Sequence, residues 1–200
     1  MTVRHDAYAR QLIARAKDGA IPPQEVRQIA QTVTECRSGR ELYQRLYAVA
    51  RAGGPEYEPL IAAHLIYPED PEVSALAVQV LTAHWKVGMK YRRQILELLG
   101  SPERDTSDDA FLAAVSGAGA ILHDGFDTEL LGTLLKLAEE GRGECNDDLV
   151  QRLAVEALAR ALGASHAELT RLPEGVTRAQ WSQSLRSAAR QKLQEAAPQP

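Results

Sequence analysis

The sequence predicts an all-α fold built from consecutive pairs of helices, and two observations lead to that prediction. Of the 200 residues, 44% are hydrophobic but only 5% are aromatic, and alanine and leucine dominate. That composition favours packed helices over sheets, because strands prefer β-branched and aromatic residues. In addition, one pattern of leucines, small residues and acids occurs three times in succession between Gly54 and Gly163.

Three leucines define the repeat. Leu60, Leu98 and Leu137 are separated by 38 and then 39 residues, and each lies 13 residues before an apolar residue that opens the second half of its copy. The apolar neighbours of these leucines, three residues before and one residue after, form one stripe on a first helix. These neighbours are Tyr57, Ile95 and Leu134, followed by Ile61, Leu99 and Ala138.

A second helix follows in each copy. Its apolar residues fall at the i, i+4, i+7, i+8 spacing of one helix face. They are Val73, Ala77, Val80 and Leu81 in the first copy, and Val150, Ala154, Ala157 and Leu158 in the third. The middle copy begins in the same position at Phe111, but its run to Leu122 allows more than one facing.

A repeated helix pair of roughly 40 residues is typical of an α-solenoid. The copies resemble HEAT repeats, in which an acidic turn, here PEDPEV or NDDLV, leads into a helix with the pattern V-x-x-x-A-x-x-A/V-L. The resemblance implies a right-handed α-α superhelix of about four helix pairs with helical caps. It also implies a concave groove lined by the second helices. The residues expected to face it are Ala75, Gln79, Ala113, Gly117, Arg152 and Glu156. Small residues there would let a partner approach closely, although close packing between neighbouring helices would explain them equally well.

The order of elements fits one domain over residues 1–200. Residues 1–53 form an N-terminal cap and a degenerate first repeat, with helices expected over 2–17, 22–37 and 40–52. Gly19 is the expected left-handed stop of the first helix. Residues 54–163 hold the three repeats, 164–196 form a C-terminal helical cap, and 197–200 are expected to be disordered. Thr177 is the expected N-cap of the last helix, whose apolar stripe would be Trp181, Leu185 and Ala188.

Charge is distributed unevenly along the chain. The net charge is −4, but residues 101–170 carry 14 acidic and 5 basic side chains, whereas residues 1–52 carry 5 acidic and 9 basic ones. An acidic centre disfavours nucleic acid, which needs a clustered positive surface. It favours a basic protein partner.

Acids recur in every turn between the two helices of a copy and predict an acidic ridge along one edge. The members proposed to contact a partner are Glu69, Asp70, Asp105, Asp108, Asp109, Asp147 and Asp148. A single Asp before a helix is explained by N-capping, worth about 1 kcal/mol. Two or three acids at each turn exceed what one cap requires, because like charges repel.

The segment from His84 to Gln94 joins the first clear copy to the next. It carries Trp85, Tyr91 and four bases, which are residue types common in binding hot spots. The same residue types also cover helix junctions with their long stems, so Trp85 and Tyr91 have two interpretations: partner binding and junction packing.

The sequence contains no motif for catalysis, a metal or a cofactor. Cys36 and Cys145 are 109 residues apart and form neither a disulfide framework nor a metal cluster. His64, His84 and His123 are isolated, and no calcium loop, His-x-x-x-His or G-x-S-x-G pattern accompanies them. We therefore expect no cofactor and no catalytic residue.

The function expected from these features is non-catalytic binding of a basic protein in the cytoplasm, as in an immunity or inhibitor protein that neutralises a basic toxin through the acidic ridge. The charged N-terminus and the absence of a long apolar run favour the cytoplasm over a membrane. Two alternatives stay open. Some DNA glycosylases resemble HEAT arrays, although they use a basic groove that this chain lacks. A structural adaptor in a larger assembly is the other. The oligomeric state is not predicted.

Overall fold

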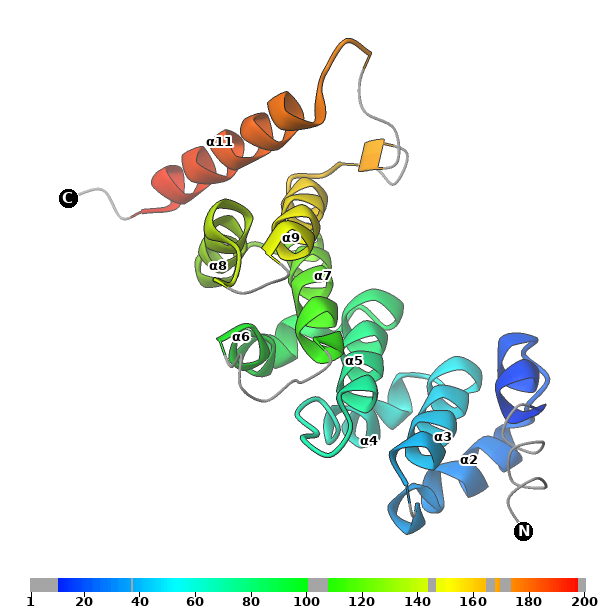
Figure 1. The fold of residues 1–200 in the computed structure, drawn as a ribbon. Helices are drawn as coiled ribbons and strands as arrows, with labels where there is room; N and C mark the ends of the chain where they lie inside the picture. Colours follow the sequence, from blue (N-terminus) through cyan, green and yellow to red (C-terminus); the bar gives the residue numbers. More distant parts are fainter. Residues whose placement is uncertain are drawn as a thin grey trace.

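The computed structural model describes residues 11–36, 38–100, 108–143, 147–164, 168–169 and 174–197, and within these residues every regular element is helical. The predicted all-α class is therefore confirmed. None of the described helices is long and apolar enough to cross a membrane. Figure 1 shows the helices following one another along an elongated body, with α2 and α3 towards one end and α11 at the other.

The N-terminal elements form a small cluster of their own. Residues 11–17 are helical and end before Gly19, whose φ of +65° makes it the predicted left-handed stop. Helix α2 (Pro23–Gln31) and helix α3 (Gly39–Ala52) follow. The expected helix to residue 37 ends earlier, because the Thr32 hydroxyl bonds the carbonyls of Gln28 and Ile29 and a 3₁₀ turn over Val33–Glu35 follows. Residue 37 itself lies outside the described residues.

Three further helix pairs follow. The first comprises α4 (Glu58–Ala62), which a 3₁₀ turn over Pro55–Tyr57 precedes, and α5 (Pro71–Gln79), which a π-helical turn over Val80–His84 extends. The second comprises α6 (Arg92–Gly100) and α7 (Asp109–Asp124). The third comprises α8 (Thr128–Glu140) and α9 (Asp147–Ala161). The boundaries fall at the predicted turns.

The pairs pack in chain order. Helix α3 contacts α5, α5 contacts α7, and α7 contacts α9, so that the second helices lie side by side in one layer (Figure 1). Helices α2, α6 and α8 each pack against the second helix of their own pair. Because neighbours in sequence are neighbours in space, each pair buries its apolar face against the next.

The predicted apolar stripe is present, and its buried centre lies one residue downstream of the defining leucines. Ile61 and Leu99 are buried, whereas Leu60 and Leu98 are only half-buried. In the third pair Leu137 itself is also buried. Buried residues from both helices of each of these three pairs belong to one continuous hydrophobic core, which extends from α3 to α11.

Helix α7 lies at the centre of that core and is buried on most of its circumference, which explains why its facing could not be read from the sequence. Phe111, Val115 and Ile121 are buried, as are its two internal glycines. A Cβ on Gly117 would lie 2.9 Å from the Val78 side chain, and one on Gly119 would lie 2.8 Å from the Ala157 backbone. The expectation that Gly117 lines the groove is therefore wrong, and close helix packing accounts for it.

The last helix, α11 (Arg178–Ala196), packs across α8 and α9. Thr177 is its N-cap as predicted, in a capping box with Gln180. The predicted stripe needs one correction, because Ala188 is exposed and Ala189 is buried. With Trp181, Leu185 and Leu193 packed on the core, the stripe repeats every four residues.

Replacing Gly119 by alanine is expected to destabilise the protein by about 2–3 kcal/mol, because the added methyl group would meet the α9 backbone. The matched control is Gly132→Ala on α8, where nothing lies within 4 Å of the added carbon. That substitution is expected to stabilise the helix by up to about 1 kcal/mol. Urea unfolding measures both changes, and equal effects of the two would contradict this account of the α7–α9 contact.

Candidate binding groove and its acidic edge

A groove runs across the layer formed by the second helices. Its volume is about 390 Å³, and its walls come from α3, α5, α7 and α9. The lining residues are Tyr43, Glu72, Ala75, Leu76, Gln79, Asp109, Leu112, Ala113, Ser116 and Leu153. Three of the residues expected to face a groove, Ala75, Gln79 and Ala113, are among them.

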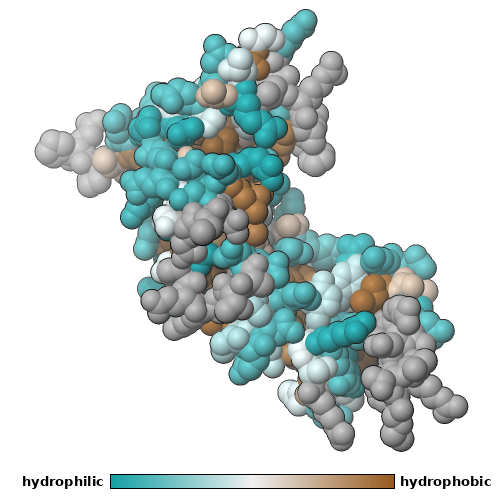
Figure 2. Space-filling model, in the orientation of Figure 1, coloured by the Kyte–Doolittle hydropathy of each residue, from teal (hydrophilic) through white to brown (hydrophobic). Residues whose placement is uncertain are grey.

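The groove combines an apolar floor with acidic side chains at one end. Leu76 and Ala113 are buried, Leu112 and Leu153 are half-buried, and hydrophobic residues reach the surface over α7 and α9 in Figure 2. Glu72 and Asp109 are both exposed and stand in the first turns of α5 and α7. Burial raises the pKa of Tyr43, and the negative charge of Glu72 raises it further.

Arg152 and Glu156, which the repeat pattern also placed in this groove, do not line it. Both line a separate pocket between α9 and α11. The C-terminal helix accounts for the difference, because it packs against α9 and forms the other wall of the pocket that these two residues line.

Asp70 is held by the protein itself. It is the N-cap of α5, and its side chain accepts a hydrogen bond from the Glu72 N–H at 3.1 Å. The carboxylate also lies against Gly39 at the start of α3, where a Cβ would come within 1.8 Å of it. Helix capping therefore explains Asp70, and Gly39 provides the space for it.

Asp108 has a different role from the expected cap. It adopts a left-handed conformation with φ of +61° and makes no capping hydrogen bond. Its carboxylate instead accepts a hydrogen bond from Arg142 at 2.5 Å. The Arg142 guanidinium is 4.2 Å from the centre of the Phe111 ring, and its side chain is only 8% exposed. This ion pair joins the turns of two successive helix pairs.

Asp147 stabilises the turn that precedes its helix. Its carboxylate accepts hydrogen bonds from the N–H groups of Arg142 at 2.7 Å and Gly143 at 2.9 Å. It also lies against Gly141, whose φ of +69° and lack of a side chain make room for it. The three equivalent acids thus have three different structural roles in neighbouring turns.

The remaining described acids of the predicted ridge face solvent. Glu69, Asp109 and Asp148 are exposed, as is Glu72 beside them. Asp105 lies outside the described residues. The described acids of the ridge therefore divide into an exposed set and a half-buried set, and the half-buried acids are those that share the position of the defining leucines.

Trp85 and Tyr91 are half-buried and pack against the main core, which is the geometry of junction packing. The Tyr91 hydroxyl donates to Glu58 at 2.8 Å, and Lys90 contacts the same carboxylate at 3.0 Å. Burial and the hydrogen bond to Glu58 raise the pKa of Tyr91 to about 12. These contacts tie the linker between two helix pairs to α4.

Asp127 is a structural residue that sequence analysis missed. It caps α8 through the Leu130 N–H at 2.9 Å and accepts from the Arg92 Nε at 2.6 Å. Burial raises the pKa of its carboxyl, but the hydrogen bonds from Leu130 and Arg92 outweigh that effect, and the pKa is lowered. An Asp directly before an apolar run was the signal that could have identified the cap. The contact with Arg92, 35 residues away, carried no local signal.

Side chains capable of chemistry are scattered in the described structure. The described residues include no group of three or more His, Cys, Asp or Glu positioned to hold a metal ion. Burial raises the pKa of the Cys36 thiol, which makes it less reactive. His64 is bonded through Nδ1 to the Leu60 carbonyl at 2.9 Å, in the manner of a structural histidine.

Comparisons of the chain with protein-family models, with curated proteins and with solved structures find no match.

Replacing Asp127 by asparagine is expected to cost about 1–2 kcal/mol at pH 7, since the cap survives but the charged contact with Arg92 is lost. Because the folded-state pKa is lowered, the carboxylate stabilises the fold above its ordinary pKa of about 3.9, and this contribution disappears as the pH falls through the lowered value. The difference in the free energy of unfolding between wild type and variant should therefore become smaller below about pH 4.

Urea unfolding at pH 7 and pH 3 measures this effect. Asp124→Asn is the matched control, because Asp124 is an exposed acid close to Asp127 in sequence. The control should change stability by less than about 0.5 kcal/mol at both pH values. A difference for Asp127→Asn that is the same at pH 7 and pH 3 would contradict the assignment.

Proposed function

We propose that this chain is a non-catalytic protein-binding module, an α-solenoid of the HEAT-like kind, whose groove holds a basic segment of a protein partner. The observation that carries the proposal is the groove itself, which is lined by four successive second helices and has an apolar floor and acidic side chains at one end. Repeat proteins commonly bind their partners on such a shared surface.

The chemistry of the groove supports a partner with both apolar and basic side chains. Leu76, Leu112 and Leu153 offer apolar area, and Tyr43 is an aromatic of the type that dominates binding energy in interfaces. Glu72 and Asp109 would meet lysine or arginine side chains at the rim. A partner with this mixed character would match both parts of the groove.

The exposed acids outside the groove extend the same preference. Glu69 precedes α5, and Asp148 lies in the first turn of α9, so both belong to the edge that carries Glu72 and Asp109. Negative charge along an edge accelerates the approach of a basic partner and repels a phosphate backbone. An inhibitor or immunity protein that binds a basic enzyme such as a nuclease needs a negatively charged edge of this kind. An adaptor that binds a basic protein needs one as well.

The double substitution Glu72→Gln with Asp109→Asn tests the proposal. Affinity purification from the source cells, with the wild type and the double variant as baits, should recover a basic protein with the wild type only. For the purified partner, calorimetry should show affinity weakened by about tenfold, because two exposed charges each contribute up to about 1 kcal/mol. The effect should diminish at high salt.

Asp124→Asn is the control, since it removes one charge at the opposite end of the same helix as Asp109. It should bind the partner as the wild type does. Equal affinity of the wild type and the double variant would contradict the proposal. Recovery of no specific protein by the wild type would contradict it as well.

A further inference from the structure

A second pocket lies between α9 and α11, outside the groove proposed to bind a protein. Its volume is about 430 Å³, within the range of sites for small molecules. Ala138, Val155, Leu169 and Trp181 supply apolar surface. Three arginines, Arg152, Arg178 and Arg186, converge on it from two helices.

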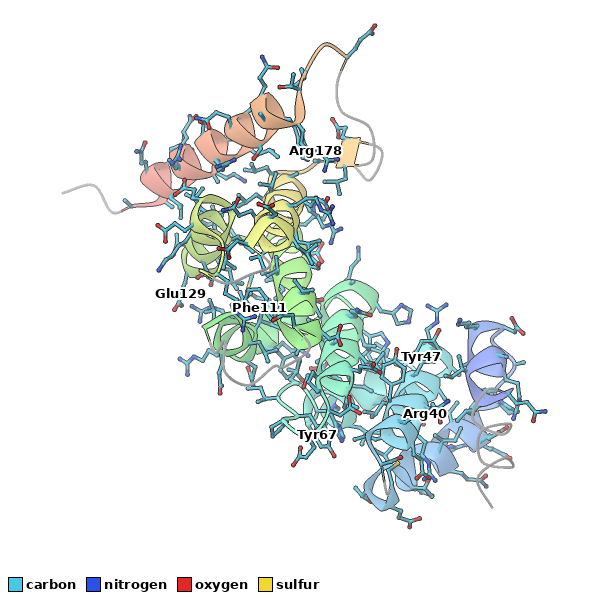
Figure 3. The ribbon with its side chains drawn as sticks, viewed as in Figure 1. Arg40, Tyr47, Tyr67, Phe111, Glu129 and Arg178 are labelled. Carbon is cyan, nitrogen blue, oxygen red and sulfur yellow. The ribbon has the colours of Figure 1, made fainter. Side chains whose placement is uncertain are left out.

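The three arginines of the pocket differ from Arg190, which also lies on α11. Arg190 on α11 forms an ion pair with Glu139 at 2.5 Å, but in the described part of the chain no ion pair joins Arg152, Arg178 or Arg186 to a carboxylate. Figure 3 places Arg178 at the beginning of α11, close to the end of α9. The pocket thus gathers positive charge that the described protein does not neutralise by direct pairing.

Arg186 is the most informative of the three. Its Nη2 donates to the Ser182 hydroxyl at 2.7 Å, which fixes the guanidinium in place. Its Nε is buried and has no hydrogen-bond acceptor among the described residues. A buried N–H of a charged group without an acceptor is costly, and an anion close to the guanidinium would offset part of that cost through its charge.

The acids of the pocket do not cancel this charge. Asp148 and Glu156 are its only lining carboxylates among the described residues, against three guanidinium groups. The excess is one positive charge, located beside the indole of Trp181 and the apolar side chains. Arginine forks match the geometry of carboxylate and phosphate oxygens, and an indole face suits a planar apolar group.

We propose that this pocket binds a small organic anion in which a carboxylate or phosphate group is attached to a planar apolar body. The oxyanion is held by Arg178 and Arg186, with Arg152 at the rim, and the apolar body packs on Trp181 and Val155. The site lies outside the groove, and among its described lining residues Asp148 is the one that also belongs to the acidic edge.

The test uses the full chain carrying Trp85→Phe, so that Trp181 is the remaining tryptophan. Benzoate, phenyl phosphate, benzyl alcohol and inorganic phosphate are titrated separately, with Trp181 fluorescence and calorimetry as readouts. Benzoate, phenyl phosphate or both should bind saturably and change the emission of Trp181, and the stronger of the two shows whether the pocket prefers a carboxylate or a phosphate. Benzyl alcohol and inorganic phosphate should each bind at least about tenfold more weakly, because each offers only half of the required chemistry.

Arg178→Gln and Arg186→Gln should each weaken binding of the better anion by about tenfold, the loss expected for one charge-assisted hydrogen bond. Arg178 is exposed, so its replacement keeps the test valid if the Arg186 variant fails to fold. Arg93→Gln, an exposed arginine outside the pocket, is the control and should bind as the parent does. Three results would each overturn the proposal. They are the absence of saturable anion binding, equal binding of benzyl alcohol, and unchanged affinity in the Arg178 variant.

Discussion

The close contact of α7 with its neighbours is the constraint on which the rest of this structure depends. At Gly117 there is no room for a side chain, because α7 lies directly against Val78 of α5. At Gly119 there is none either, because α7 lies against the backbone of α9. Two glycines inside a helix cost about 1 kcal/mol each relative to alanine. That cost is offset by the continuous core that the closely packed second helices bury. The opposite face of the same helices forms the floor of the groove.

The turns at one edge and the linkers at the other hold this layer in place by different means. At the acidic edge, Asp70 and Asp147 accept backbone N–H groups, and Asp108 pairs with Arg142 in the next turn. At the opposite edge, Arg92 at the start of α6 pairs with Asp127, the N-cap of α8 in the next helix pair. Much of the charge that the sequence concentrates in the turns therefore serves the fold.

The sequence predicted the elements well and the surfaces poorly, for a physical reason. Helix spacing and capping are local, so the helix pairs, the stop at Gly19 and the cap at Thr177 could be read directly. Gly117 could not be placed, because its burial depends on the side chain that α5, the preceding second helix, presents to it. The pocket around Arg186 could not be predicted either. Helix α11 lies after the last repeat, so the repeat spacing does not indicate how it packs on α9.

Hydrogen–deuterium exchange of the protein alone and with its purified partner tests the central claim, that the groove on the second helices is the contact surface. We expect slower exchange on binding in residues 72–79 of α5 and 109–116 of α7, which line the groove, and no change in residues 86–97 at the opposite edge. Protection confined to residues 86–97, with none in α5 or α7, would contradict the account.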